Sequence, residues 1–400
     1  TQATGATVDL GDDDDPLTLG AFVNTVTVSD VETIVGGSTN DTVTLATQAT
    51  GTVLDLGAGL DRLILGAFDN TVTVGGAETV TGGTADDTLV LGGFVNTVTV
   101  SNVETVTGGV STDLVTFGAA VTGATVDLGT GADKLTLDAA GATVTVAGVE
   151  TVTGSAIDDL VTLAGTATGT TVDLGSGDDA LVLGAFETNL TVSEVETITG
   201  GASADTVTLA TQATGTIVDL AGGGDALTLG AFVNTVTVSD VETLTGGSDD
   251  DTVTLATRAS GIALDLDAGA DTLVLGAFVN TLTVSNVETL VGGGGVDTVT
   301  FDTQATGSTV DLAGGADTLV LGAFDNTVTV GGVETVTGAG GDDTVTFSAA
   351  VTGATVDLGV GADTLVFDAG GATVTVLGVE TVTASAVADR LTHGGAGPAR

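Results

Sequence analysis

The 400-residue chain contains no Cys, Met, Trp or Tyr, only one His, and five basic residues against 53 acidic ones. Without Cys it can form neither a disulfide nor a thiolate metal site or nucleophile. Its formal net charge is −48. Binding of nucleic acid or of an anionic membrane surface needs clustered Lys and Arg, and the chain has too few of them. No apolar run approaches the roughly 20 residues that span a bilayer. These absences predict a protein with no nucleic-acid partner and no membrane insertion.

No signal peptide opens the chain, which begins in the middle of a repeat pattern. We therefore expect either a fragment or a protein whose targeting signal lies elsewhere. The 63 Gly and the 42% of hydrophobic residues, dominated by Val and Leu beside Thr, predict many short strands joined by tight turns. No segment shows the 3.6-residue apolar period of a helix.

The tripeptide V-E-T, once A-E-T, marks an internal repeat. Its Glu recurs every 46 residues, except that Glu104 follows Glu78 after only 26. One repeat has therefore lost a 20-residue segment. The nine positions are Glu32, Glu78, Glu104, Glu150, Glu196, Glu242, Glu288, Glu334 and Glu380.

This deletion suggests how the repeat is built. A full repeat from Asp41 to Asp86 has two parts that each open with Asp followed by apolar residues at the second and fourth positions. The pattern predicts a 20-residue coil followed by a 26-residue coil. We expect an all-β fold, a right-handed parallel β-solenoid (β-roll or β-helix) of roughly 17 coils of alternating 20 and 26 residues. It should run continuously over residues 1–400, with a terminal tail at 392–400.

Alternation within each strand predicts which side chains face inward. In the segment DTVTL, Val43 and Leu45 should point into the core while Thr42 and Thr44 point out. The V-E-T segment is out of phase, so the sequence leaves open which way Glu32 points.

Each opening Asp follows a Gly-rich turn such as GGSTND or GAGLD. Gly permits positive φ and close approach to an ion, the turn offers backbone carbonyls, and calcium takes six to eight such oxygens. Carboxylates stacked about 4.8 Å apart repel by roughly 1 kcal/mol in water and by more in a lower dielectric. A calcium ion between coils would reverse this repulsion. The alternatives are turns in which Asp bonds its own backbone, and carboxylates screened by water or high salt.

The turns GAGLDRLIL at Gly57, GSGDDALVL at Gly175 and GGGGVDTVT at Gly292 resemble the haemolysin-type (repeats-in-toxin, RTX) nonapeptide G-G-x-G-x-D-x-U-x. The resemblance implies multiple Ca²⁺ ions held between stacked turns by the motif Asp and by carbonyls of turn glycines, here Gly57, Gly59, Gly175, Gly177, Gly292 and Gly293. The family repeats its motif every nine residues on both edges. Here we expect metal at one edge only. The metal-ligating candidates are Asp15, Asp41, Asp61, Asp87, Asp113, Asp133, Asp159, Asp179, Asp205, Asp225, Asp251, Asp271, Asp297, Asp317, Asp343 and Asp363.

Two further rows recur with the repeat. A mid-strand Asp row should form a solvated outer face that opposes aggregation. It comprises Asp9, Asp55, Asp127, Asp173, Asp219, Asp265, Asp311 and Asp357. Phe in the motif GAF or GGF should form an aromatic ladder closing a corner of the core. Its members are Phe22, Phe68, Phe94, Phe186, Phe232, Phe278 and Phe324.

We expect no catalytic residue and no enzymatic activity, because every Asp has equivalents and His393 is the only His. The predicted function is a structural, calcium-stabilised repeat region of a secreted or cell-surface protein, such as an adhesin stalk, an S-layer (surface-layer) protein or a matrix filament. Self-association into filaments or a lattice is expected. The alternatives are a polysaccharide-active β-helix enzyme and a carbohydrate- or ice-binding module. The outward Thr pairs that would favour ice binding are interrupted, for example at Arg62 and Ile64.

Overall fold

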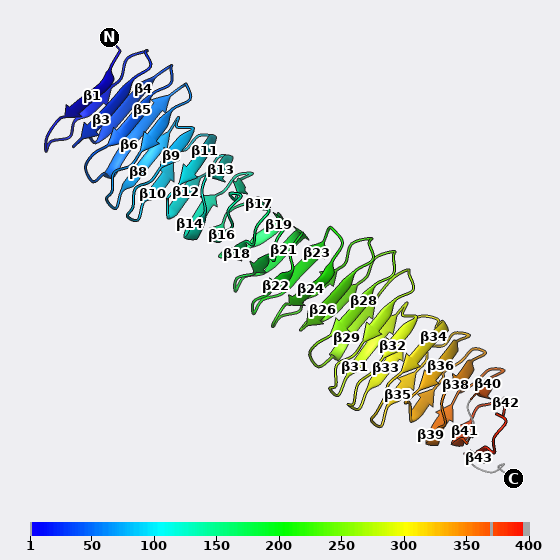
Figure 1. Cartoon of the computed structure of the whole chain (residues 1–400). Coiled ribbons are helices and arrows are strands. Elements are labelled where there is room, and N and C mark those ends of the chain that lie inside the picture. Colours follow the sequence, from blue (N-terminus) through cyan, green and yellow to red (C-terminus); the bar gives the residue numbers. More distant parts are fainter. Residues whose placement is uncertain (1, 369–370, 395–400) are drawn as a thin grey trace. The chain divides into compact units, whose positions relative to one another are not determined.

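The computed structural model describes residues 2–368 and 371–394. The chain divides into two compact units, Thr1–Ser203 and Ala204–Arg400, and each is a stack of short strands (Figure 1). The described part of the chain contains no helix, and so no helix long and apolar enough to cross a bilayer is found there. The predicted all-β fold is confirmed. A single solenoid continuing over residues 1–400 stays a prediction.

The first unit alternates its strands between two sheets in chain order, named here the odd sheet and the even sheet. Its odd sheet contains β1 (Thr4–Asp9), β3 (Thr25–Ser29), β5 (Thr42–Leu45), β7 (Arg62–Ile64), β9 (Thr79–Thr81), β11 (Asn96–Ser101), β13 (Asp113–Phe117), β15 (Lys134–Thr136), β17 (Thr151–Ser155), β19 (Ala167–Gly175) and β21 (Thr188–Ser193). Its even sheet contains β2 (Pro16–Thr18), β4 (Thr33–Gly37), β6 (Thr50–Gly57), β8 (Thr71–Gly75), β10 (Thr88–Leu91), β12 (Thr105–Gly109), β14 (Val121–Gly129), β16 (Ala142–Ala147), β18 (Leu160–Leu163), β20 (Ala180–Val182) and β22 (Thr197–Thr199).

The second unit follows the same rule. Its odd sheet contains β23 (Asp205–Leu209), β25 (Ala226–Thr228), β27 (Thr243–Thr245), β29 (Ser260–Asp265), β31 (Thr281–Ser285), β33 (Thr298–Phe301), β35 (Thr318–Val320), β37 (Thr335–Thr337), β39 (Thr352–Asp357), β41 (Thr373–Leu377) and β43 (Arg390–His393). Its even sheet contains β24 (Thr214–Asp219), β26 (Thr235–Ser239), β28 (Thr252–Leu255), β30 (Thr272–Val274), β32 (Thr289–Val291), β34 (Thr306–Asp311), β36 (Thr327–Gly331), β38 (Thr344–Phe347), β40 (Thr364–Phe367) and β42 (Thr381–Thr383). The predicted tail lies outside the described residues from residue 395 on.

Neighbouring strands of each sheet pair in parallel, which confirms the parallel β-solenoid. The predicted 20-residue coil is found, but the predicted 26-residue coil is wrong. Thr25 of β3 pairs with Thr42 of β5, Thr42 pairs with Arg62 of β7, and Thr50 of β6 pairs at a bulge with Thr71 of β8. Paired strand residues on successive coils are accordingly 17, 20 or 21 residues apart. Each coil thus takes one strand from each sheet. The 26-residue part carries three strands, because its V-E-T segment forms a strand of its own.

The five strands β3 to β7 make up one 46-residue repeat before the next repeat starts at β8. Five is an odd number, and strands alternate between the sheets. Equivalent segments of consecutive repeats therefore lie on opposite sheets, as Thr25–Ser29 and Thr71–Gly75 do in the first unit.

The apolar core lies between the two sheets, as the alternation predicts. Val43 and Leu45 are buried, with 0% and 4% of their surfaces exposed, and Thr42 and Thr44 are half-buried on the outer face. Leu63 lies beside Val43 on the next coil and is also fully buried. Full burial of such a side chain contributes about 1.5–3 kcal/mol.

The predicted aromatic ladder in the core is wrong. The seven Phe of the GAF and GGF turns are 42–79% exposed. In one such turn the Nδ2 of Asn70 donates to the carbonyls of Gly66 (3.1 Å) and Phe68 (2.7 Å). Asn70 is 1% exposed and fills the corner from inside. The ring of Phe68 therefore lies outside, against Gly66.

Candidate functional site: buried aspartate ladders

The predicted metal-ligating aspartates are nearly all buried. Asp15 is half-buried. The other fifteen are 0–2% exposed, namely Asp41, Asp61, Asp87, Asp113, Asp133, Asp159, Asp179, Asp205, Asp225, Asp251, Asp271, Asp297, Asp317, Asp343 and Asp363. Buried charges are expensive unless they are paired or hydrogen-bonded, so their partners decide what these residues do.

The aspartates do not follow one edge of the solenoid, so the expectation of a single motif-bearing edge is wrong. Asp41 and Asp61 precede odd-sheet strands, and Asp87 precedes β10 of the even sheet. Asp113 begins β13 and Asp133 precedes β15, both again in the odd sheet. The alternation follows from the odd number of strands in each repeat. The expected column with one Asp on every coil is divided into pairs.

Each pair belongs to a chain of hydrogen bonds that crosses from coil to coil. The Ala3 N–H donates to Asn24 Oδ1 at 3.1 Å. The Asn24 N–H and Nδ2 both donate to Asp41 Oδ1 at 2.9 Å. The Asp41 N–H donates to Asp61 Oδ1, and the Asp61 N–H to Glu78 Oε2, both at 2.6 Å. We name this set an aspartate ladder, with Asp41 its first Asp and Asp61 its second Asp.

The second unit repeats the ladder. The Ala213 N–H donates to Asn234 (3.0 Å), Asn234 to Asp251 (3.0 Å), Asp251 to Asp271 (2.7 Å) and Asp271 to Glu288 (3.0 Å). Two more complete ladders are Ala259–Asn280–Asp297–Asp317–Glu334 and Ala305–Asn326–Asp343–Asp363–Glu380. In the first unit, Ala142 takes the place of Asn and donates to Asp159 at 2.7 Å.

These bonds explain why polar side chains are buried here. Each one accepts the backbone N–H of the equivalent residue on the preceding coil, a donor that would otherwise be buried without a partner. Bonds to a charged acceptor are short and contribute about 1.5–3 kcal/mol each. Since every bond joins two coils, the ladder fixes the position of each coil on the one before it.

In the pairs Asp41/Asp61, Asp159/Asp179 and Asp251/Asp271, the two aspartates differ at their second oxygen. Oδ2 of a first Asp can accept a turn amide, as Asp41 does from Gly37 (3.3 Å) and Asp251 from Gly247 (3.0 Å). Oδ2 of a second Asp is buried without a hydrogen-bond donor. This holds for Asp61, Asp133, Asp179, Asp225, Asp271, Asp317 and Asp363, and for the first aspartates Asp113, Asp297 and Asp343.

Burial raises the pKa of the second aspartates. It raises the pKa of Asp179 to about 6, against a lowering effect of the bond from the Asp159 N–H. The charged groups that raise it further, Asp159, Glu196 and Asp158, are all acidic. The pKa of Asp271 is likewise raised to about 6, mainly by burial. A buried oxygen in such surroundings is stabilised by a proton or by a cation.

The Gly-x-Asp pattern has a packing reason. A Cβ on Gly131 would lie 2.6 Å from Oδ1 of Asp133 and 2.8 Å from the carbonyl oxygen of Ser111 on the preceding coil. Only Gly leaves room for the buried carboxylate beside the neighbouring turn. The glycine is therefore required two positions before the second Asp, whereas the first Asp of a ladder can have another residue there, as Asp41 has Thr39.

The arrangement meets calcium's needs in part. Each second Asp has a free oxygen next to a Gly-rich turn, and hard cations prefer such oxygens. Within the described ranges, no three or more Asp, Glu, His or Cys side chains form a group that could hold a metal ion. The remaining ligands would have to be backbone carbonyls, and the carbonyl of Gly293 already accepts the Gly314 N–H at 3.2 Å. Calcium binding by the sixteen aspartates stays a prediction.

Sequence reasoning missed the roles of the Asn and Glu residues. Asn24 stands directly before the strand Thr25–Ser29, just as Asp41 stands before Thr42–Leu45. This shared position was the available signal for the Asn row. The sequence left the V-E-T Glu open, and the structure shows that Glu78 Oε2 accepts a ladder N–H. The outer row from Asp9 to Asp357 is exposed, apart from half-buried Asp219.

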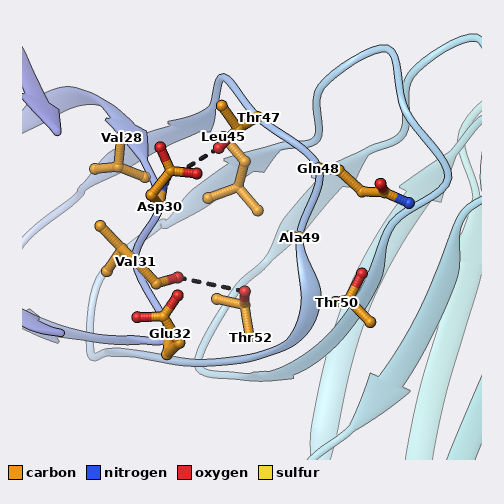
Figure 2. Close-up of a pocket in the computed structure, with 10 residues that line it drawn as sticks. All are labelled: Val28, Asp30, Val31, Glu32, Leu45, Thr47, Gln48, Ala49, Thr50 and Thr52. Atoms are coloured by element: carbon orange, nitrogen blue, oxygen red, sulfur yellow. Dashed lines mark hydrogen bonds between the residues drawn. The ribbon is translucent and has the colours of Figure 1, made fainter. Parts of the chain in front are cut away.

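A pocket of about 190 Å³ lies where the turn carrying Asp30 and Glu32 meets the turn carrying Thr47 (Figure 2). The Asp30 N–H donates to Thr47 Oγ1 at 3.1 Å, and Thr52 Oγ1 donates to the Val31 carbonyl at 3.3 Å. Pockets at the equivalent place in two later repeats measure about 40 and 10 Å³. Such a recurring space of variable size belongs to the repeat's turns.

A scan against protein-family models finds no match for this chain, and a search of curated proteins finds none. The similarity to RTX repeats therefore rests on the turn motifs alone.

Proposed function

We propose that this chain is a structural repeat region of an extracellular or cell-surface protein, serving as a stalk, surface-layer or filament element. The observation that carries the proposal is the recurrence of one ladder through each unit. The residues that join one coil to the next recur from repeat to repeat, as expected if stacking of the coils is their role. An enzyme would instead need a singular constellation.

Calcium is the cofactor that the proposal includes. Two observations support it: the buried, unpartnered Oδ2 of each second Asp, and the resemblance of the preceding turns to RTX repeats. The second aspartates would hold the ion together with turn carbonyls. A bound cation would neutralise the paired carboxylates and stabilise only the folded state. The acidic chain would then fold after export, where calcium reaches millimolar levels.

Chelation tests the calcium part. The whole chain is heated at low ionic strength in EGTA and in 5 mM calcium, with far-UV circular dichroism as the readout. Matched samples contain 5 mM magnesium, or enough NaCl to equal the calcium in ionic strength. We expect calcium, and neither control, to raise the melting temperature. Equal melting curves in EGTA and calcium would remove calcium from the proposal and leave the structural role intact.

A second experiment tests the structural role itself. The chain is applied to a glycan array and to a panel of polysaccharide-hydrolysis assays. A structural element should be silent in both. Saturable binding of one glycan class would establish a binding module instead, and turnover would establish an enzyme.

A further inference from the structure

The shortened repeat leaves an unusual set of turns on the first unit. Successive coils turn from the even sheet to the odd sheet at residues 58–61, 76–78, 92–95 and 110–112. The preceding strands β6, β8, β10 and β12 pair side by side in that order (Figure 1). The last two turns are in contact, because Ser111 Oγ donates to the Gly93 carbonyl at 3.2 Å. The four turns therefore form one continuous strip.

This strip gathers exposed apolar side chains. Phe94 is 79% exposed, Val110 78%, Leu60 71% and Val95 68%. By contrast, Phe68 in the equivalent turn one repeat earlier is 44% exposed. We name Leu60, Phe94, Val95 and Val110 the short-repeat patch. Apolar residues gathered in this way mark interaction sites, whereas scattered ones do not.

A cavity of about 400 Å³ lies beside Phe94. Val53, Leu54 and Thr73 contribute to its wall, as do Gly75 and Gly76. These two glycines stand where the preceding repeat has a Ser-Asp pair, so the usual side chains are missing from the cavity. Apolar cavities of about 150 Å³ accept a benzene ring, and this one has room for an aromatic side chain.

The strip also exposes no acidic side chain. Its four turns read AGLD, GAE, GGFV and VST, and their two acidic residues, Asp61 and Glu78, are buried and half-buried. Turns at the opposite edge of the same unit, which run from the odd sheet to the even sheet, carry the exposed residues Asp30, Asp86, Asp158 and Asp178. Two copies of a chain with a net charge of −48 repel one another. That repulsion is weaker at this strip than at those turns, although Asp55 lies at the cavity wall.

We infer that the short-repeat patch is an interface between two copies of this chain. A protruding Phe94 next to a cavity that fits an aromatic ring is complementary to itself under two-fold rotation, so that each Phe94 enters the other copy's cavity. This inference rests on the proposed structural function, because the interface would serve that function. It would join two chains side by side, whereas the ladders join the coils within one chain.

Sedimentation velocity over a range of micromolar concentrations, at 0.05 and 0.5 M NaCl, tests the interface. We expect a monomer–dimer equilibrium that strengthens with salt, since salt screens the repulsion between copies. Phe94→Asp should weaken dimerisation at least tenfold. Its matched control Phe68→Asp, in the equivalent turn, should leave dimerisation unchanged.

A second variant tests the cavity without touching Phe94. A Cβ on Gly75 would come no closer than 4.0 Å to any neighbour, so Gly75→Leu should fill the cavity while the coil stays folded. Dimerisation should weaken again. A strict monomer at all concentrations, or equal effects of Phe94→Asp and Phe68→Asp, would overturn the interface but not the structural role. Glycan binding or hydrolysis would overturn the structural role but not the interface.

Discussion

The ladders of a full repeat and of the shortened repeat share both ends but not their middle. The full ladder runs Ala3–Asn24–Asp41–Asp61–Glu78, and the short one runs Ala49–Asn70–Asp87–Glu104. In the short ladder the N–H of Asp87 donates directly to Glu104 Oε2 at 2.7 Å. Its Oδ2 accepts the Gly83 N–H, also at 2.7 Å. Both oxygens of Asp87 thus have donors, whereas Oδ2 of Asp61 has none.

The difference separates two roles. Asn, the first Asp and Glu are sufficient for a complete ladder, since the short repeat does without a second Asp. The second Asp extends the ladder by one 20-residue coil and leaves one buried oxygen without a donor. That oxygen is where a proton or a cation would act.

The largest expected effect comes from breaking the short ladder. In Asp87→Ala, the Asn70 N–H and the Gly83 N–H lose their acceptor, whereas Asn70 Nδ2 keeps the carbonyls of Gly66 and Phe68. Each buried unsatisfied donor costs about 1–3 kcal/mol, so local stability should fall by about 2 kcal/mol or more. Amide hydrogen exchange at Asn70 would measure it. The exposed outer-face variant Asp55→Ala is the control and should change exchange by less than about 0.5 kcal/mol. Similar protection in both variants would contradict the ladder.

Replacing each kind of Asp by Asn sharpens the comparison. Asp61→Asn keeps the acceptor for the Asp41 N–H, removes one of two neighbouring charges, and places its amide where no donor is present. We expect it to raise stability in EGTA by about 1 kcal/mol. In Asp87→Asn, the side-chain NH2 group must face either the Asn70 N–H or the Gly83 N–H, and two donors then oppose each other. The substitution should lower stability by about 1–3 kcal/mol. Thermal unfolding followed by circular dichroism measures both. Shifts of the same sign would refute the distinction between the two positions.

The pH dependence in EGTA should be the mildest effect. The pKa of Asp179 and of Asp271 is raised to about 6 by burial, so the folded chain binds these protons more tightly than the unfolded one. Their stabilising contribution is complete below about pH 4 and is lost as the pH rises through about 6. The melting temperature should therefore be higher at pH 4.5 than at pH 7.5. Asp179→Asn combined with Asp271→Asn should reduce this difference. A melting temperature that rises from pH 4.5 to 7.5 would contradict the assignment.

Strand positions and the inward face could be predicted from sequence, because a two-residue period survives in every segment. Val43 and Leu45 show this, and so does the removable 20-residue unit. The assignment of strands to sheets could not be predicted, because it depends on pairing between segments that are distant in the chain, such as Thr25 with Thr42 and Thr50 with Thr71. The Asn row was missed because Asn24 differs in residue type from Asp41, although both stand directly before a strand. Phe68 was misplaced because hydrophobicity alone does not reveal that an Asn side chain already fills the corner.

The odd number of strands in a repeat gives the chain a parity rule. Copying one 46-residue repeat would transfer every later side chain to the opposite flank, and copying two would restore it. The 20-residue loss between Glu78 and Glu104 removed two strands, an even number, and so it left all later segments on the flank they would otherwise occupy. Length changes in such a chain are therefore tolerated in whole coils. If a repeat that carries a surface substitution were duplicated, the two copies of the substituted residue would lie on opposite flanks.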